Sequence, residues 1–394
     1  MAVRPGYKQT DVGVIPEDWT AEPLGELSEF ITSGSRGWAA FYSDQGALFI
    51  RSQNVRAGRL DFDDTQFVNP PKGAEGNRTR VRRNDLLITI TGNSVGNVAL
   101  VDCEFDEAYI SQHVGLVRLS EASLGNYVSR FLSPGSPGNN QIWASQSGQS
   151  KPGLTLRNLQ DFWVALPPSE AEQQAIATAL SDVDALLDAL GRLIGKKRDL
   201  KQATMQQLLT GQTRLPGFQG DWEVQRLGDV VQIQKGQLIT SSTLKSGDIP
   251  VIAGGKQPAY FHALANRLGR TITISASGAS AGYVALWDGP IFASDCSTIS
   301  ESESYCLDFV FYQLLSKQQA IYKAQTGGAQ PHVHAKDLNP ILFSFPPMAE
   351  QVAIANVLSD IDGELAALEQ RLVKTRALKQ GMMQELLTGR TRLI

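Results

Sequence analysis

Two stretches of the chain carry apolar residues at alternating intervals of four and three positions, which places them in one stripe along an α-helix. In the first stretch the stripe consists of Ile176, Leu180, Val183, Leu187, Leu190 and Ile194. In the second it consists of Ile354, Leu358, Ile361, Leu365, Leu368 and Leu372. This spacing is typical of helices that pack along each other, so the pattern predicts two long helices with facing apolar seams.

The two predicted helices are copies of one element. Residues 172–215 and 350–393 align without a gap at a constant offset of 178 residues, and 26 of the 44 positions are identical. Ser169 precedes the first copy, with Glu172 three positions later, which is the pattern of a capping box; the second copy lacks that serine. The string LLTG ends both copies at Gly211 and Gly389, and a glycine is the usual residue after a helix C-terminus.

The segments that precede the helices repeat each other more weakly. Asp18-Trp19 matches Asp221-Trp222 at an offset of 203, whereas residues 92–100 match residues 278–286 at an offset of 186. Offsets that change along the chain indicate loops of different length on one shared fold. Runs of β-branched and apolar residues bounded by glycine turns predict strands over residues 86–91, 98–101, 271–275 and 284–287.

The chain therefore reads as domain, helix, domain, helix, and the predicted class is α+β. We expect two β-rich α/β domains over residues 1–167 and 213–346, and helices within residues 168–212 and 347–394. The duplicated seams favour an antiparallel coiled coil with a pseudo-two-fold internal repeat. The alternative is that both helices lie inside one globular core.

Composition narrows the class of protein. The formal net charge is −4, with 36 Lys and Arg against 40 Asp and Glu, which disfavours a nucleic-acid binder that acts alone. No apolar run approaches the ~18 residues of a membrane span, and the N-terminus lacks the apolar region of a secretory signal. The three cysteines form no CxxC pair, so we expect a cytoplasmic protein without disulfides.

The sequence offers little chemistry for catalysis. Asn69-Pro70-Pro71-Lys72 resembles a motif of amino-methylating DNA methyltransferases in which an aromatic residue stacks on the target base, but position 72 is lysine. No glycine-rich cofactor loop precedes it, so a Pro-Pro turn is the better interpretation. His332 and His334 could share one face of a strand, yet no third metal ligand lies nearby in the sequence. We therefore expect no catalytic residue, metal or cofactor in this chain.

Polar residues on glycine turns, together with a basic cluster, suit contacts to nucleic acid. Arginine pairs with guanine and asparagine or glutamine with adenine, and cations neutralise phosphates. Ordinary hairpin turns and a solvated basic face would explain the same residues equally well. The candidate contacts are Arg51, Ser52, Gln53, Asn54, Lys72, Arg78, Arg80, Asn93, Ser94, Lys151, Lys256, Gln257, Ser277, Ser280, Gln330 and His332.

The duplicated strings LPPSEAEQQAIATALSDVD and FPPMAEQVAIANVLSDID, each followed by LKQ and LLTG, are similar to the specificity subunits of type I restriction–modification systems. The resemblance extends over the whole chain and is strongest in the helices. It implies two target-recognition domains that each read one half of a bipartite double-stranded DNA site, held apart by the helix pair. It implies two methyltransferase subunits and restriction (motor) subunits as partners, and S-adenosylmethionine, magnesium and ATP only in those partners.

Two other hypotheses stay open at this stage. The chain could be a coiled-coil scaffold whose two domains bind protein or glycan, or the specificity component of an orphan modification system. The resemblance does not reveal which bases are read, because recognition domains differ most at that surface.

Overall fold

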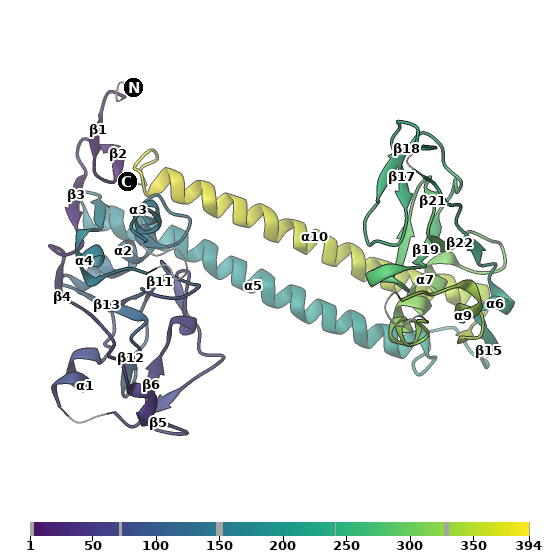
Figure 1. The fold of residues 1–394 in the computed structure, drawn as a ribbon, viewed down its shortest axis with the longest axis horizontal. Helices are drawn as coiled ribbons and strands as arrows, with labels where there is room; N and C mark the ends of the chain where they lie inside the picture. The colour runs from purple at the N-terminus through teal and green to yellow at the C-terminus, as the bar shows by residue number, and fades with distance from the viewer. Residues whose placement is uncertain (1–3, 71–72, 147–152, 241, 327–330, 394) are drawn as a thin grey trace. The chain divides into compact units, whose positions relative to one another are not determined.

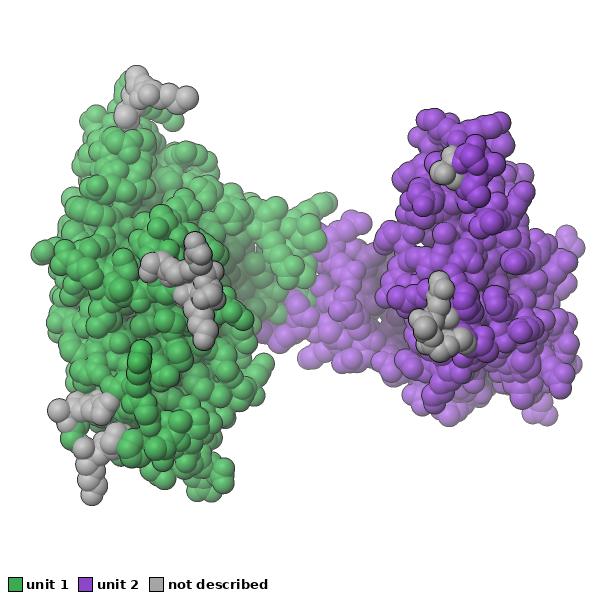
Figure 2. Space-filling view, in the orientation of Figure 1, with its two compact units in different colours: residues 1–190, 371–394 green, residues 191–370 purple. Residues whose placement is uncertain are grey.

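A computed structural model describes residues 4–70, 73–146, 153–240, 242–326 and 331–393. The chain divides into two compact units, which we call unit 1 (residues 1–190 and 371–394) and unit 2 (residues 191–370; Figure 2). The segments predicted as long helices form α5, Glu170–Leu209, and α10, Met348–Leu386 (Figure 1). Each helix contributes one part to each unit. No helix among the described residues is long and apolar enough to cross a membrane.

Unit 1 contains two four-stranded sheets. The antiparallel sheet has the order β11-β10-β13-β4, with β11 Val98–Leu100, β10 Leu86–Thr89, β13 Val114–Leu119 and β4 Ser28–Ser33. The mixed sheet has the order β12-β6-β9-β5, with β12 Ala108–Ile110, β6 Ala47–Ile50, β9 Phe67–Val68 and β5 Tyr42–Ser43. Two-stranded ribbons join β1 Tyr7–Thr10 to β2 Gly13–Pro16, β3 Thr20–Pro23 to β14 Trp163–Leu166, and β7 Val55–Arg56 to β8 Arg59–Leu60. The short helices are α1 Ala74–Thr79, α2 Gly125–Leu132, α3 Asn139–Ala144 and α4 Leu156–Asp161.

Unit 2 repeats this plan with fewer strands. Its antiparallel sheet has the order β16-β22-β19-β20, with β16 Gln234–Lys235, β22 Cys296–Ser300, β19 Thr271–Ser275 and β20 Val284–Trp287. The second sheet has the order β18-β17-β21, with β18 Tyr260–His262, β17 Ile249–Ile252 and β21 Phe292–Ala293. A ribbon pairs β15 Glu223–Arg226 with β23 Leu342–Phe345. The short helices are α6 Leu227–Val230, α7 Leu307–Ser316, α8 Gln318–Lys323 and α9 Ala335–Leu338.

The two units share one topology. Strands β11, β10, β13 and β4 of unit 1 correspond in order and direction to β20, β19, β22 and β16 of unit 2. Each second sheet contains one parallel pair, β6 with β12 and β17 with β21. The four strands predicted from the sequence are present as β10, β11, β19 and β20, which confirms the diverged repeat at the level of the fold.

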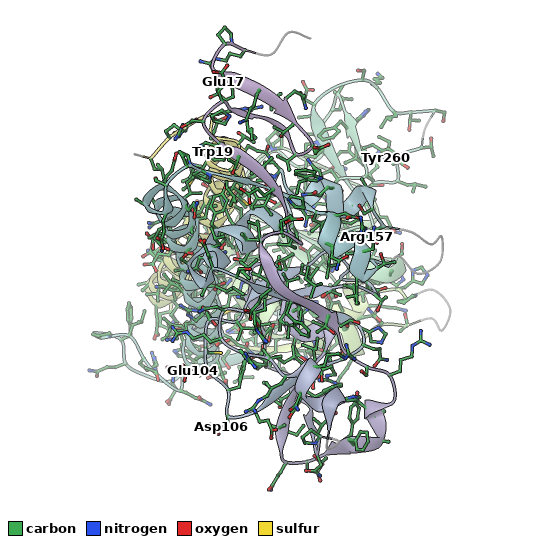
Figure 3. All side chains as sticks on the ribbon, turned by 90° about the vertical axis from the view of Figure 1, so that its left-hand side faces the viewer. Glu17, Trp19, Glu104, Asp106, Arg157 and Tyr260 are labelled. Carbon is green, nitrogen blue, oxygen red and sulfur yellow. The ribbon has the colours of Figure 1, made fainter. Side chains whose placement is uncertain are left out.

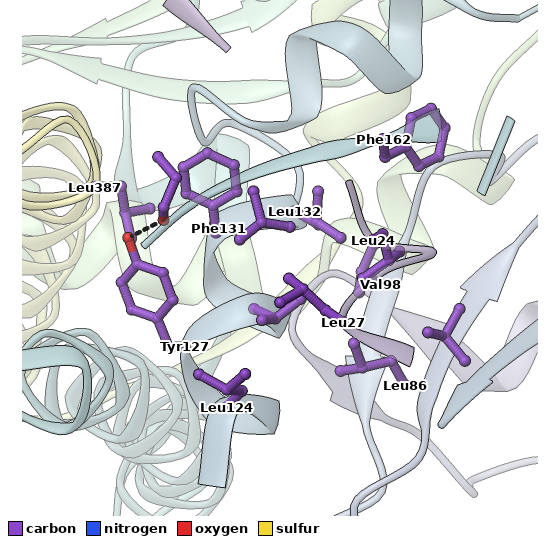
Figure 4. Packing of buried hydrophobic residues seen from close by; sticks show 14 of the residues in the cluster. Leu24, Leu27, Leu86, Val98, Leu124, Tyr127, Phe131, Leu132, Phe162 and Leu387 are labelled. Atoms are coloured by element: carbon purple, nitrogen blue, oxygen red, sulfur yellow. Dashed lines mark hydrogen bonds between the residues drawn. The ribbon is translucent and has the colours of Figure 1, made fainter. Parts of the chain in front are cut away.

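The ends of the long helices belong to the cores of the units. In unit 1, the start of α5 contributes the fully buried Ile176 and Leu180, and Leu387, just after α10, packs in the same cluster as Tyr127 (Figure 4). In unit 2, the roles of the helices are exchanged, and the cluster contains Ile354 and Leu358 of α10 with Leu208 and Leu209 of α5.

This arrangement corrects the expectation that all twelve stripe residues form a seam between the helices. Ile176 and Leu180 pack into the core of unit 1, and Ile354 and Leu358 into that of unit 2. The reason is that the strands and α2 or α7 cover the first turns of each helix. Leu190, Ile194 and Leu365 are buried and Val183, Leu187, Ile361, Leu368 and Leu372 are half-buried, so none of the twelve is exposed.

The helix ends partly follow the sequence prediction. Ser169 caps α5, since its Oγ accepts a hydrogen bond from the Glu172 amide at 3.2 Å. The reciprocal bond of a capping box is not made, because the Glu172 carboxylate instead accepts bonds from Arg392. Gly211 and Gly389 adopt φ of 73° and 66°, a conformation that strongly favours glycine and ends both helices.

Repeat-equivalent ion pairs join the two long helices in each unit. In unit 1, Lys379 of α10 binds Asp184 of α5; in unit 2, Lys201 of α5 binds Asp362 of α10. Both aspartates and both lysines are related by the offset of 178 residues. Within each unit, partners of residues later in α5 lie earlier in α10, so the helices run antiparallel there.

A second repeated contact fixes the chain that enters each domain. It consists of Glu172, Arg392 and Trp19 in unit 1 and of Glu350, Arg214 and Trp222 in unit 2. Glu350 is fully buried and accepts two hydrogen bonds of 2.6 Å from Arg214, whose guanidinium lies 5.4 Å from the Trp222 ring. Trp19 is fully buried in unit 1 (Figure 3). The Asp-Trp match seen in the sequence therefore marks the junction between domain and helix.

Candidate nucleic-acid interface

Three loops meet beyond one end of the antiparallel sheet in unit 1. They follow β10 (from Ile90), follow β12 (from Ser111), and precede α4 (at Gly153). Ile90 receives a backbone bond at its carbonyl from Leu154 and donates to the carbonyl of His113. Thr91 pairs with Gly153 in an isolated β-bridge, and its hydroxyl contacts Nδ1 of His113.

The corresponding loops of unit 2 meet in the same way. Ser277, two residues after β19, pairs with His332 in an isolated bridge, and its hydroxyl donates to the carboxylate of Asp295. The Ala276 amide donates to the Asp295 carbonyl at 3.1 Å, and the Val333 amide donates to the Ala276 carbonyl at 2.9 Å. Each unit thus holds a hydroxyl side chain between the same two neighbouring loops.

A close backbone approach fixes the middle loop in both units. The Ser111 amide donates to the Ile50 carbonyl at 2.9 Å, and the equivalent Ser294 amide donates to the Ile252 carbonyl at 2.7 Å. Gly34 lies against Ser111, and Gly236 lies against Ser294, so closely that a Cβ would collide with the serine backbone. A glycine is therefore required at both positions. The residue after each serine, Gln112 or Asp295, points from a rigid frame.

The turn at residues 51–54 serves mainly to hold its own loop. Arg51 forms an ion pair of 3.0 Å with Asp64, and Gln53 also donates to Asp64. Asn54 is 2% exposed, and its amide donates to the carbonyls of Asp61 and Asp64 at 2.9 and 2.8 Å. The prediction that Asn54 reads a base is wrong for this conformation, because its amide is buried and already bonded. Ser52 is half-buried within the same turn.

The predicted basic cluster is divided between different contacts. Arg78 donates to Thr32, to the carbonyl of Ser33 and to Ser35, so it fastens α1 to the loop after β4. The Arg80 guanidinium reaches the Asp106 carbonyl at 3.4 Å. Both arginines remain exposed, whereas Lys72 lies outside the described residues.

The remaining candidates lie on or near the three loops. Asn93 is exposed, and Ser94 contacts the Ser52 carbonyl at 3.5 Å. In unit 2, Lys256 lies 5.5 Å from the Tyr283 ring and Gln257 is exposed. Ser280 and Ser277 flank a short 3-10 turn, and His332 stacks on His334 at 5.8 Å. Lys151 and Gln330 lie outside the described residues.

Sequence reasoning missed the middle loop of each unit. In unit 2 this loop borders a cavity of about 370 Å³ lined by Lys235, Ala276, Asp295, Cys296, Ser297, His334, Ala335 and Lys336. The cavity therefore combines one carboxylate with three groups able to carry positive charge. The available signal was weak: Ser-Gln-His and Ser-Asp-Cys each follow a short apolar strand, at an offset of 183 that matches no other repeat.

Known proteins share both the sequence and the fold. The model of the type I restriction modification DNA specificity domain matches residues 16–196 and 219–375. A Methanocaldococcus jannaschii protein named as the specificity subunit of type I restriction enzyme MjaX is 24% identical, over 98% of this chain and 97% of its own length. The crystal structure of a type I restriction-modification S subunit from M. genitalium superposes with a TM-score of 0.67 at 17% identity, covering 98% of both chains.

A second solved structure shares the fold as well. It comes from work on complex assembly and conformational transition of the type I R-M system, and it superposes with a TM-score of 0.55 at 19% identity, over 96% of this chain and 99% of its own. Two family matches therefore fall on two units of one topology, joined by duplicated helices. The chain belongs to the DNA specificity subunits of type I restriction–modification systems.

Proposed function

We propose that residues 1–167 and 213–346 are two target-recognition domains, each of which reads one half of an asymmetric, bipartite double-stranded DNA site. The observation that carries this proposal is the three-loop frame, which has the same backbone contacts in both units but different side chains. One frame with two sets of side chains suits two readers of different sequences. Phosphate contacts would position the duplex and base contacts would specify it.

We propose further that the helices within residues 168–212 and 347–394 form an antiparallel coiled coil that sets an unread spacer between the half-sites. The repeated Asp–Lys pairs and the absence of any exposed residue among the twelve described stripe positions support this packing. The ends that enter the domain cores would hold each domain in a fixed orientation on its helix.

Two equivalent methyltransferase subunits are the partners that the helix surfaces favour. Leu200 and Leu378 are related by the repeat, identical, and 50% and 58% exposed. Lys196 and Lys374, one turn earlier, are also identical and exposed. Exposed residues have no packing reason to stay identical while the domains diverge, so a partner that binds twice explains them. Restriction subunits would join the resulting complex.

We propose that this chain has no catalytic centre of its own and acts in the cytoplasm, where its DNA substrate lies. Methyl transfer and cleavage, with S-adenosylmethionine, magnesium and ATP, would belong to the partner subunits. A coiled-coil scaffold for protein or glycan is the competing function, and the specificity component of an orphan modification system is a variant of the leading one.

Exchange of residues 1–165 for the first domain of another family member tests the two-reader proposal. The chain is produced with its methyltransferase subunits in a host without adenine methylation, and methylated adenines are mapped across the genome. We expect one half-site to change while the other half-site and the spacer stay the same. A continuous recognition sequence, or a change in both half-sites, would contradict the proposal; no methylation by the unaltered complex would favour the scaffold.

A further inference from the structure

We propose that Gln112 and Asp295 are equivalent base-reading residues, and that Gln112 reads an adenine in one half-site whereas Asp295 reads a cytosine in the other. The inference rests on the proposed recognition of a bipartite DNA site. Neither residue belongs to the turns or basic cluster that the sequence singles out.

The two residues occupy the same position on the fold. Each follows the serine that extends the parallel strand pair, Ser111 after β12 or Ser294 after β21. Each serine amide is bonded to the neighbouring strand, and each serine backbone lies against a glycine that tolerates no side chain. Because the frame is fixed by backbone contacts, the side chain that follows it can vary without cost to the fold.

Neighbouring polar groups orient both side chains. The Gln112 amide nitrogen lies 3.2 Å from Nε2 of His113, whose Nδ1 contacts the hydroxyl of Thr91. The Asp295 carboxylate accepts a hydrogen bond from Ser277, the counterpart of Thr91, through Oδ2. Oδ1 of Asp295 receives no hydrogen bond within the described chain, and both residues are half-buried rather than covered. Each side chain is therefore held from one side and keeps a polar group for a ligand.

The difference between the two side chains determines the base that each can bind. An amide both donates and accepts, which matches N6 and N7 of adenine, whereas a carboxylate only accepts, which matches the N4 amino group of cytosine. Lys235, His334 and Lys336 line the cavity beside Asp295. These groups would attract the phosphates that flank the base and offset the repulsion between a carboxylate and DNA.

The test uses the assembled complex with its methyltransferase subunits. In Asp295→Asn, the amide should replace the cytosine requirement by adenine at one position of one half-site, and leave the other half-site and the spacer unchanged. In Gln112→Glu, the converse change, adenine to cytosine, should appear in the opposite half-site. Asp288→Asn is the matched control, because Asp288 is a surface carboxylate of the same unit with a side chain 82% exposed.

Binding to duplexes substituted at each position provides a second readout if a variant no longer methylates. We expect discrimination at one base pair to fall by about 5- to 150-fold while preferences elsewhere are retained. Unchanged motifs in both variants, or a uniform loss of binding over all positions, would overturn the inference. Failure of the unaltered complex to methylate any bipartite site would instead refute the proposed function.

Discussion

Replacing Leu358 by alanine should destabilise unit 2 and leave unit 1 intact. Leu358 lies two turns into α10, is fully buried, and packs in the cluster that contains Phe309 and Phe343. Removal of its outer carbons forfeits about 2–2.5 kcal/mol of transfer free energy at ~0.8 kcal/mol per buried carbon. The cavity left behind raises the total to about 3 kcal/mol.

Hydrogen–deuterium exchange of the intact chain measures this change unit by unit. Since about 1.4 kcal/mol corresponds to a factor of ten, slow amides of β19, β22 and α7 should exchange about 150-fold faster in the variant. Amides of β10 and β13 in unit 1 should keep their rates. Leu180→Ala, the repeat-equivalent change, should reverse the pattern, because Leu180 is fully buried in unit 1.

Leu200→Ala provides the matched control. It makes the same chemical change on α5, but Leu200 is 50% exposed, so it should alter exchange rates by less than about threefold. Equal acceleration in both units, or an effect of Leu358→Ala no larger than that of Leu200→Ala, would refute the assignment of the helix ends to separate domain cores.

Two further predictions concern the partners and the cysteines. Leu200→Glu together with Leu378→Glu should prevent assembly with methyltransferase subunits, and either change alone should leave one copy bound in native mass spectrometry; two bound copies in the double variant would contradict the proposed surface. Burial raises the pKa of the Cys296 thiol to about 12, so iodoacetamide at pH 8 should label the exposed Cys103 well before Cys296 in the folded chain. Equal labelling would show that the loop beside Asp295 opens readily.

The long helices and their duplication follow from the sequence alone. An apolar stripe, a capping serine and a terminal glycine act within a few residues of one another, so their effect on structure is local. The constant offset of 178 residues made the repeat visible without any fold. The strands of both antiparallel sheets were predictable for the same reason, from short apolar runs between glycine turns.

Only the tertiary structure decided what each polar residue does. Asn54 has the chemistry of a base reader, yet distant carbonyls of its own loop bury and occupy its amide. Gln112 and Asp295 were not recognisable as counterparts, because loops of different length shift the offset from 203 at the start of the domains to 183 at this point. Their equivalence depends on backbone contacts between strands far apart in the chain, which no local pattern encodes. Likewise, Leu180 and Leu358 carry the same stripe as the rest of the seam, and only the packing of the domains over the helix ends removes them from it.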